Sequence, residues 1–104
     1  MRKCRIVLSS PKVNYDLLID EEKGYCRFCK KILSVNIKEL LDAIEKTIKH
    51  WVSDTSKSMA IDGVLLNVYF LDVENNMREL KYNNLTLPNN FEVLFNLLEG
   101  LNGY

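Results

Sequence analysis

Apolar and polar residues alternate along the first third of the chain with the period of β-strands. Residues 4–9 form a short, largely apolar run that Ser10-Pro11 ends. From Val13 to residue 20 every second side chain is apolar, so one row of side chains is expected in a core and the other outside it. The turn residues 21–24 suit a hairpin, and a third strand is predicted from residue 25 to about residue 32.

The middle of the chain changes to the period of an amphipathic helix. Asn36 is placed to cap its first turn, and Glu39 stands three residues later, as in a capping box. The helix is predicted to end near Ser53, and the polar stretch 54–58 is predicted to be a mobile connection. Its apolar positions are Ile37, Leu40, Leu41, Ile44, Ile48, Trp51 and Val52.

The rest of the chain predicts a hairpin and a second helix. Asp62-Gly63 leads into a strand over 64–71 that is apolar on both faces, and Asn75-Asn76 turns the chain into a fifth strand over 77–82. Pro88 ends this segment, and Asn89 or Asn90 is expected to cap the last helix. The apolar stripe of that helix consists of Phe91, Leu94, Phe95, Leu97, Leu98 and Leu101.

These elements predict an α+β fold with the order β-β-β-α-β-β-α. A mostly antiparallel five-stranded sheet with two helices on one face forms a two-layer sandwich. A chain of 104 residues fits a single domain over 1–104 that can bury a core.

Composition adds few constraints on function. Hydrophobic residues make up 47% of the chain and its formal net charge is zero, so nothing global points to nucleic acid or to an acidic membrane. Residues 1–57 hold twelve Lys/Arg against eight Asp/Glu, and residues 58–104 hold two against six, which is a modest dipole. No apolar run suits a membrane span or a signal peptide, and three cysteines fit a reduced, cytoplasmic protein.

The second half of the chain contains four short motifs within residues 48–98: Trp51, Asp62-Gly63, Asn84 and Pro88-Asn89-Asn90-Phe91. With these motifs the chain resembles a loose group of small bacterial proteins without an established activity, common in low-GC Gram-positive organisms and their mobile elements. Tyr82-Asn83 stands where the group usually has a glycine before the asparagine. The resemblance implies the same fold and a mobile-element setting, and it implies no catalytic residue.

Cys26 and Cys29 have the one spacing in the chain that is typical of a metal site. Only Cys4 and His50 remain as further soft ligands, and residues three apart on a strand point to opposite faces. A redox pair would need a helix that begins there. The prediction is therefore thiols in or near the core, with no metal and no cofactor.

The sequence also lacks a recognisable catalytic arrangement. His50, the sole histidine, is expected in the last turn of the long helix, where an imidazolium favours the helix dipole. Asp62 is interpreted as a turn residue. The carboxylates of Asp16, Asp20, Glu21 and Glu22 are interpreted as solvated charges around the first hairpin. No nucleophile elbow or phosphate-binding glycine loop is present, so we predict that the protein is not an enzyme.

Nucleic-acid binding is the second-ranked hypothesis. The segment 25–31 interleaves Arg27, Lys30 and Lys31 with Tyr25 and Phe28. On one continuous strand, Tyr25, Arg27, Cys29 and Lys31 would share a face, while Phe28 would point to the other.

The first-ranked hypothesis concerns the sheet face that the helices leave uncovered. Leu18, Tyr25, Leu65, Tyr69 and Leu71 are expected on that face, with Asn67, Asp16 and Arg27 around them. An apolar patch with tyrosines and a polar rim is typical of a protein interface. Another protein or a second copy could bind there, and the alternative is that a loop or the stretch 54–61 covers the face.

The sequence thus favours a small non-enzymatic protein-binding module. An inhibitor or immunity protein of a phage or other mobile element, for example against a bacterial defence nuclease, fits the size and the resemblance.

Overall fold

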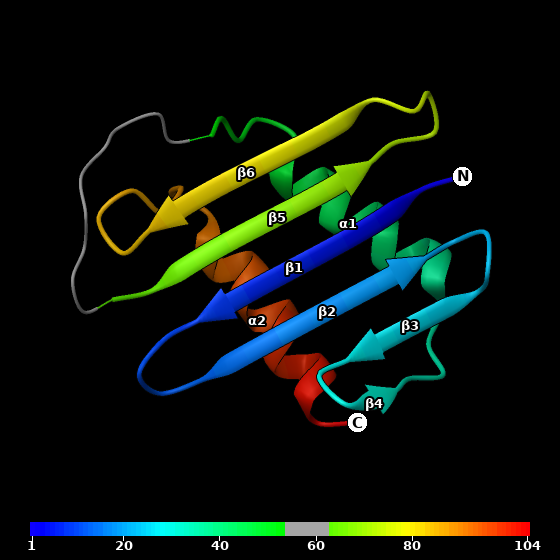
Figure 1. Ribbon diagram of the computed structural model, residues 1–104, viewed down its shortest axis with the longest axis horizontal. Helices are drawn as coiled ribbons and strands as arrows, with labels where there is room; N and C mark the ends of the chain where they lie inside the picture. Colours follow the sequence, from blue (N-terminus) through cyan, green and yellow to red (C-terminus); the bar gives the residue numbers. More distant parts are fainter. Residues whose placement is uncertain (54–62) are drawn as a thin grey trace.

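The computed structural model describes residues 1–53 and 63–104 of the chain, and it has the predicted α+β architecture (Figure 1). Within these residues there are six strands and two helices. In chain order they are β1 (Lys3–Ser9), β2 (Asn14–Asp20), β3 (Tyr25–Phe28), β4 (Lys31–Ile32), α1 (Ile37–Ile48), β5 (Leu65–Leu71), β6 (Met77–Asn83) and α2 (Phe91–Asn102).

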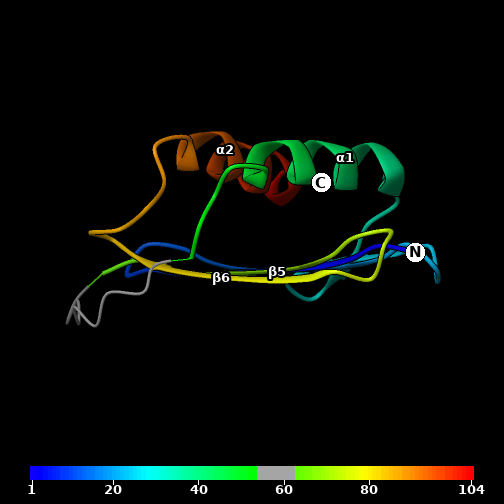
Figure 2. The ribbon, with the colours of Figure 1, turned by 90° about the horizontal axis from the view of Figure 1, so that it is seen from above.

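All described strands belong to one sheet with the order β4-β3-β2-β1-β5-β6, and every pairing is antiparallel. Of the five long strands, β1 is the central one. Both helices lie on the same side of the sheet, as predicted (Figure 2).

The single strand predicted over 25–32 is wrong, because the chain reverses within it. Cys29 has a φ of 55° and ends β3, and β4 then pairs back on β3. The backbone N–H of Cys29 donates to the Asp16 carbonyl at 2.8 Å, and that of Leu33 donates to the Cys26 carbonyl at 2.8 Å. These hydrogen bonds offset the roughly 1–2 kcal/mol that a left-handed backbone costs a residue other than glycine. The predicted count of five strands fails for the same reason.

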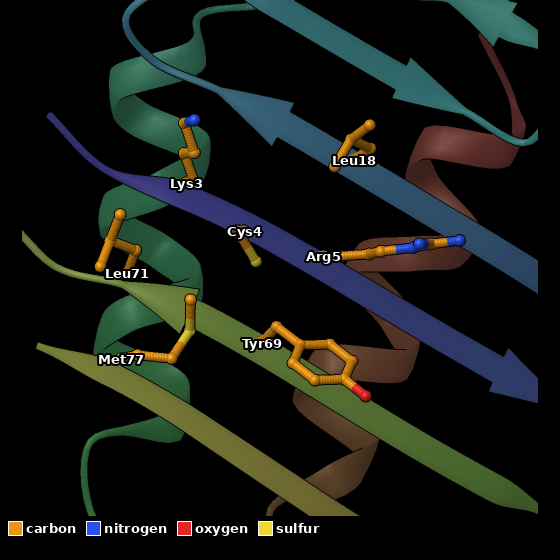
Figure 3. Close-up of a pocket in the computed structure, with 7 residues that line it drawn as sticks. All are labelled: Lys3, Cys4, Arg5, Leu18, Tyr69, Leu71 and Met77. Atoms are coloured by element: carbon orange, nitrogen blue, oxygen red, sulfur yellow. The ribbon is translucent and has the colours of Figure 1, made fainter.

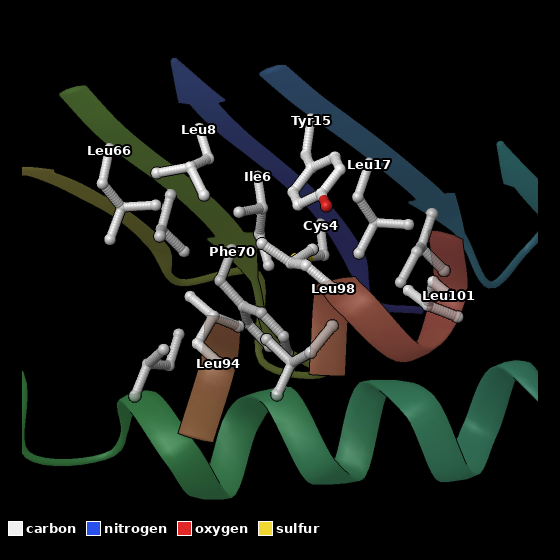
Figure 4. Close-up of a cluster of buried hydrophobic side chains, with 14 of the residues drawn as sticks. Cys4, Ile6, Leu8, Tyr15, Leu17, Leu66, Phe70, Leu94, Leu98 and Leu101 are labelled. Carbon is white, nitrogen blue, oxygen red and sulfur yellow. The ribbon is translucent and has the colours of Figure 1, made fainter. Parts of the chain in front are cut away.

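The core lies between the sheet and the helices. In β1, β2 and β5 every second residue is buried, and these side chains meet the apolar stripes of α1 and α2. Figure 4 shows Leu66, Leu8, Leu17 and Phe70 from the strands next to Leu94, Leu98 and Leu101 of α2. The alternation that predicted one core face per strand is therefore confirmed.

Helix α1 begins where the sequence predicts but ends earlier. The Asn36 side chain accepts a hydrogen bond from the Glu39 N–H at 3.1 Å, which confirms the N-cap. The last helical residue is Ile48 rather than a residue near Ser53. Arg78 of β6 explains the end, because its guanidinium donates to the carbonyls of Ile48 and Trp51 at 2.9 and 2.5 Å.

Trp51 therefore packs in the core from outside the helix. Its ring meets Tyr82 edge-on, with the ring centroids 5.7 Å apart. Its indole N–H donates to the Asn90 side chain at 2.5 Å, and the Asn90 amide donates to the Thr47 carbonyl at 3.0 Å. Asn90 stands at the N-cap position of α2 but makes no side-chain capping hydrogen bond, contrary to expectation. It joins the start of α2 to the end of α1 instead.

Two polar residues connect the sheet to the helices, and the sequence patterns did not reveal either connection. Arg2 is buried, and its guanidinium donates to Glu21 at 3.0 Å and to Asp42 of α1 at 2.6 Å. The Tyr15 hydroxyl of β2 donates to the Glu99 carboxylate of α2 at 2.7 Å. This hydrogen bond to a carboxylate raises the pKa of Tyr15.

Candidate protein-binding face

The side of the sheet that points away from α1 and α2 is the candidate site, and we call it the open face. Its residues are those that alternate with the buried ones and pair with one another across the strands. They are Lys3, Arg5, Val7 and Ser9 of β1, Asn14, Asp16, Leu18 and Asp20 of β2, Tyr25 and Arg27 of β3, Leu65, Asn67, Tyr69 and Leu71 of β5, and Met77, Glu79 and Lys81 of β6.

The five apolar residues predicted for this face all lie on it. Leu65 is 53% exposed, and Leu18, Tyr25, Tyr69 and Leu71 are half-buried. Their partly buried state results from neighbours on adjacent strands, because no described helix or loop covers the centre of the face (Figure 1). The stretch 54–61, which the sequence analysis named as a possible cover of this face, falls outside the described residues.

A shallow hollow lies on the open face over the start of β1 and the end of β5. It has a volume of about 350 Å³, and its lining includes Leu18, Tyr69, Leu71 and Met77 (Figure 3). A second hollow of about 310 Å³ begins at Leu18 and extends to Tyr25. The two hollows share Lys3 and Leu18, so an apolar surface with a charged edge runs across several strands.

The charges on the open face are largely paired within the chain. Asp16 lies between two arginines, 3.2 Å from Arg5 and 3.6 Å from Arg27, and Lys3 lies 3.8 Å from Asp20. The Arg27 Nε is buried and has no hydrogen-bond partner among the described residues. Exposed pairs of this kind add little to stability, and they leave donors and acceptors available to a partner.

Sequence reasoning did not assign Val7, Met77, Glu79 and Lys81 to this face. Met77 is 62% exposed and pairs with Leu71, while Glu79 pairs with Tyr69. The signal was present in the Asn75-Asn76 turn, because a hairpin closed there fixes which residues of β6 lie opposite β5.

The basic residues of the nucleic-acid hypothesis do not lie on one surface. Arg27 is on the open face, and Lys30 is in the turn between β3 and β4. Lys31 pairs with Phe28, a core residue, and its ammonium donates to the Tyr104 carbonyl at 2.5 Å. The expectation that Tyr25, Arg27, Cys29 and Lys31 share a face is wrong, because the strand ends at Phe28.

The thiols are similarly separated. Cys4 and Cys26 are buried, whereas Cys29 is exposed at the turn. Burial raises the pKa of the Cys26 thiol, and burial together with the nearby Cys26 raises that of Cys4. In residues 1–53 and 63–104 no group of three or more His, Cys, Asp or Glu side chains is arranged to hold a metal ion.

The remaining candidate positions are His50, Asp62 and the residues of the motif resemblance. His50 is exposed and follows α1, rather than lying in its last turn. Asp62 falls outside the described residues, and at Gly63 a Cβ atom would overlap the Asn84 side chain. Gly63 with Asn84, and Trp51 with Asn90, are thus contacts between segments of the fold. These four residues of the motif resemblance therefore have architectural roles here.

Comparisons with known proteins add no family to this picture. No helix in the described part of the chain is long and apolar enough to cross a membrane. No family model, no curated protein and no solved structure matches the chain.

Proposed function

We propose that this protein is a non-enzymatic protein-binding module whose contact surface is the open face. The observation that carries the proposal is an apolar surface of Leu18, Tyr69 and Leu71 in the middle of a sheet that no described element covers. An antiparallel sheet can expose a polar face to water, so the polar residues of the open face need no partner, but the leucines and tyrosines grouped among them do not fit that pattern. Exposed apolar side chains grouped on one face favour a partner.

The composition of the face also supports a protein partner. Tyrosine, methionine and arginine are enriched at protein interfaces, and the open face holds Tyr25, Tyr69, Met77, Arg5 and Arg27. The paired charges around the apolar residues resemble the polar rim of such interfaces. An inhibitor or immunity protein of a phage or other mobile element fits the size of the chain and the motif resemblance.

The test is capture of a partner by the tagged chain from bacterial lysate, with and without nuclease treatment. Leu65→Asp and Tyr69→Asp place a charge on the open face, and both should abolish capture of a stoichiometric protein while the circular dichroism spectrum stays unchanged. Val93→Asp is the matched control, because Val93 is 49% exposed on α2, away from the open face.

The same experiment separates the nucleic-acid alternative. Binding that nuclease removes, that weakens with salt and that is lost on neutralising Arg27, Lys30 and Lys31 would favour that alternative. Capture that survives nuclease but is unchanged in both open-face variants would show that the proposed surface is wrong.

A further inference from the structure

Two apolar hollows lie side by side at one end of the open face. The first lies over the start of β1 and the end of β5, and Tyr69 and Leu71 line it (Figure 3). The second lies over the end of β2 and the start of β3, and Tyr25 lines it. Lys3 and Leu18 line both hollows, so these two side chains lie between them. Adjacent strands are about 4.8 Å apart, so the centres of the hollows, two strands apart, are separated by roughly 10 Å.

Cationic side chains outnumber carboxylates around the hollows. Lys3, Arg5 and Lys23 line them, and Asp20 is the only carboxylate that does so among the described residues. Lys3 lies 3.8 Å from Asp20, which is a long ion pair, and its side chain is 54% exposed. The Lys3 ammonium is therefore accessible to a second carboxylate that comes from outside the chain.

The remaining carboxylates of the open face are already bound to cations of the same chain. Asp16 lies 3.2 Å from Arg5 and 3.6 Å from Arg27, so one carboxylate serves two arginines. Glu79 lies 2.9 Å from Lys81. With the turn lysine that lines the second hollow, five cations and three carboxylates belong to this surface. An approaching molecule meets a net positive charge, which favours an acidic partner over a basic one.

The separation of the hollows also selects the backbone of the partner. Two apolar side chains that enter both hollows must extend from the same side of a segment, roughly 10 Å apart. In an α-helix, residues i and i+7 lie on one face about 10.5 Å apart, with i+3 and i+4 between them. In an extended strand, side chains on one face are about 6.8 or 13.6 Å apart, so they fit one hollow but miss the other. The spacing therefore favours a helix.

We propose that the partner binds the open face through an acidic amphipathic helix that crosses the strands. Its apolar side chains at i and i+7 enter the two hollows, and an Asp or Glu at i+3 or i+4 binds Lys3 between them. This inference rests on the proposed function and names the kind of surface that the partner presents. Leu18, Leu71 and Met77 line the first hollow, and they suit an aliphatic or aromatic side chain better than a nucleic-acid phosphate.

The dimensions of the face suit one helix. Its five long strands span roughly 20 Å, which a helix of about 13 residues crosses. One helix buries less surface than a standard protein interface, so the complex should be transient, with a dissociation constant on the order of 10 μM.

The first test selects helical peptides without knowledge of the natural partner. A phage library of peptides of about 18 residues on an alanine-rich helical host, with one face randomised, is selected on the immobilised full chain. Peptides that also bind Tyr69→Asp are removed. We expect the enriched peptides to carry large apolar residues at i and i+7, Asp or Glu at i+3 or i+4, and few Lys or Arg.

The second test is a charge exchange with the most enriched peptide, measured by fluorescence anisotropy. Lys3→Glu should raise its dissociation constant about tenfold or more, and Lys3→Gln should raise it less. A peptide with Lys in place of the acidic residue should bind Lys3→Glu more tightly than the wild type. Lys38→Glu is the matched control, because it reverses an exposed charge on α1 and should leave binding unchanged. Circular dichroism spectra check that all variants fold.

Enrichment of this pattern together with the charge exchange would establish the inference. No enrichment, enriched peptides that are basic or lack the i, i+7 spacing, or equal binding to Lys3→Glu would overturn it. Displacement of the peptide by a single-stranded oligonucleotide would also overturn it, because nucleic acid would then occupy the face. Self-association of the wild type that Tyr69→Asp removes would do the same in favour of a second copy.

The proposed function can fail separately from this inference. Peptides or lysate proteins that bind the wild type but not Leu65→Asp and Tyr69→Asp, without the expected pattern, would leave the proposed function intact. Binding that tolerates both substitutions would contradict the proposed function and the inference together.

Discussion

Arg2 shows how one residue connects three parts of the fold. Its backbone N–H and its guanidinium both bind Glu21 in the β2–β3 turn, and the guanidinium also binds Asp42 of α1. Hydrogen bonds between charged groups each contribute about 1.5–3 kcal/mol when they are partly shielded from water. The sequence pattern does not reveal this role, because the partners lie 19 and 40 residues away.

Replacing Arg2 by methionine keeps the aliphatic stem and the backbone N–H, and it removes the hydrogen bonds of the guanidinium to Glu21 and Asp42. We expect Arg2→Met to lower the free energy of unfolding by about 2 kcal/mol, as measured by urea denaturation. Lys38→Met, at an exposed position of α1, should change it by less than about 0.5 kcal/mol. Equal effects of the two substitutions would show that Arg2 is not a structural connection.

The same contact gives a prediction for acid pH. The hydrogen bonds from Arg2 lower the pKa of Glu21 below its ordinary value of 4.5. A group with a lowered pKa contributes its full stability above the unfolded value and loses it as the pH falls through the folded value. Wild-type stability should therefore fall more steeply below pH 4.5 than that of Arg2→Met. Parallel curves of unfolding free energy against pH for the two proteins would contradict this.

At the scale of the element, the end of α1 depends on the strand that lies against it. Arg78 of β6 donates to the carbonyls of Ile48 and Trp51, and the Tyr82 hydroxyl donates to the carbonyl of Val52 at 2.6 Å. A cationic side chain at a helix C-terminus also interacts favourably with the helix dipole. The helix thus stops where β6 supplies donors, and its apolar period, which continues to Val52, did not predict the stop.

Arg78→Met should loosen this end of the helix. We expect a loss of about 2 kcal/mol in unfolding free energy, with faster amide hydrogen exchange concentrated in the last turn of α1. Lys81→Met changes the same strand on the open face and should leave the exchange of α1 unchanged. Uniformly faster exchange throughout the molecule in Arg78→Met would mean that the residue supports the whole fold rather than the helix end.

At the scale of the whole molecule, the sequence was informative wherever periodicity alone decides the structure. Period-two alternation placed Leu17 in the core and Leu18 outside it, and it did the same for Phe70 and Tyr69. The open face could be predicted because the strand 64–71 is apolar on both sides. The reversal at Cys29 could not be predicted, since neither glycine nor asparagine marks it and the stabilising backbone hydrogen bond comes from Asp16 of another strand.

Self-association, if it uses the open face, must appear in the stability of the entire chain. A partner that binds only the folded state raises the midpoint of unfolding in proportion to the logarithm of its concentration. With self-association through the open face, the wild-type Tm should therefore rise with protein concentration, whereas the Tm of Tyr69→Asp should stay constant, because this substitution places a charge on the open face. Differential scanning calorimetry over a hundredfold range of protein concentration measures this. For such self-association we expect the wild-type Tm to change by about 2 °C or more over that range. Equal concentration dependence in both proteins would place any self-association on another surface than the open face.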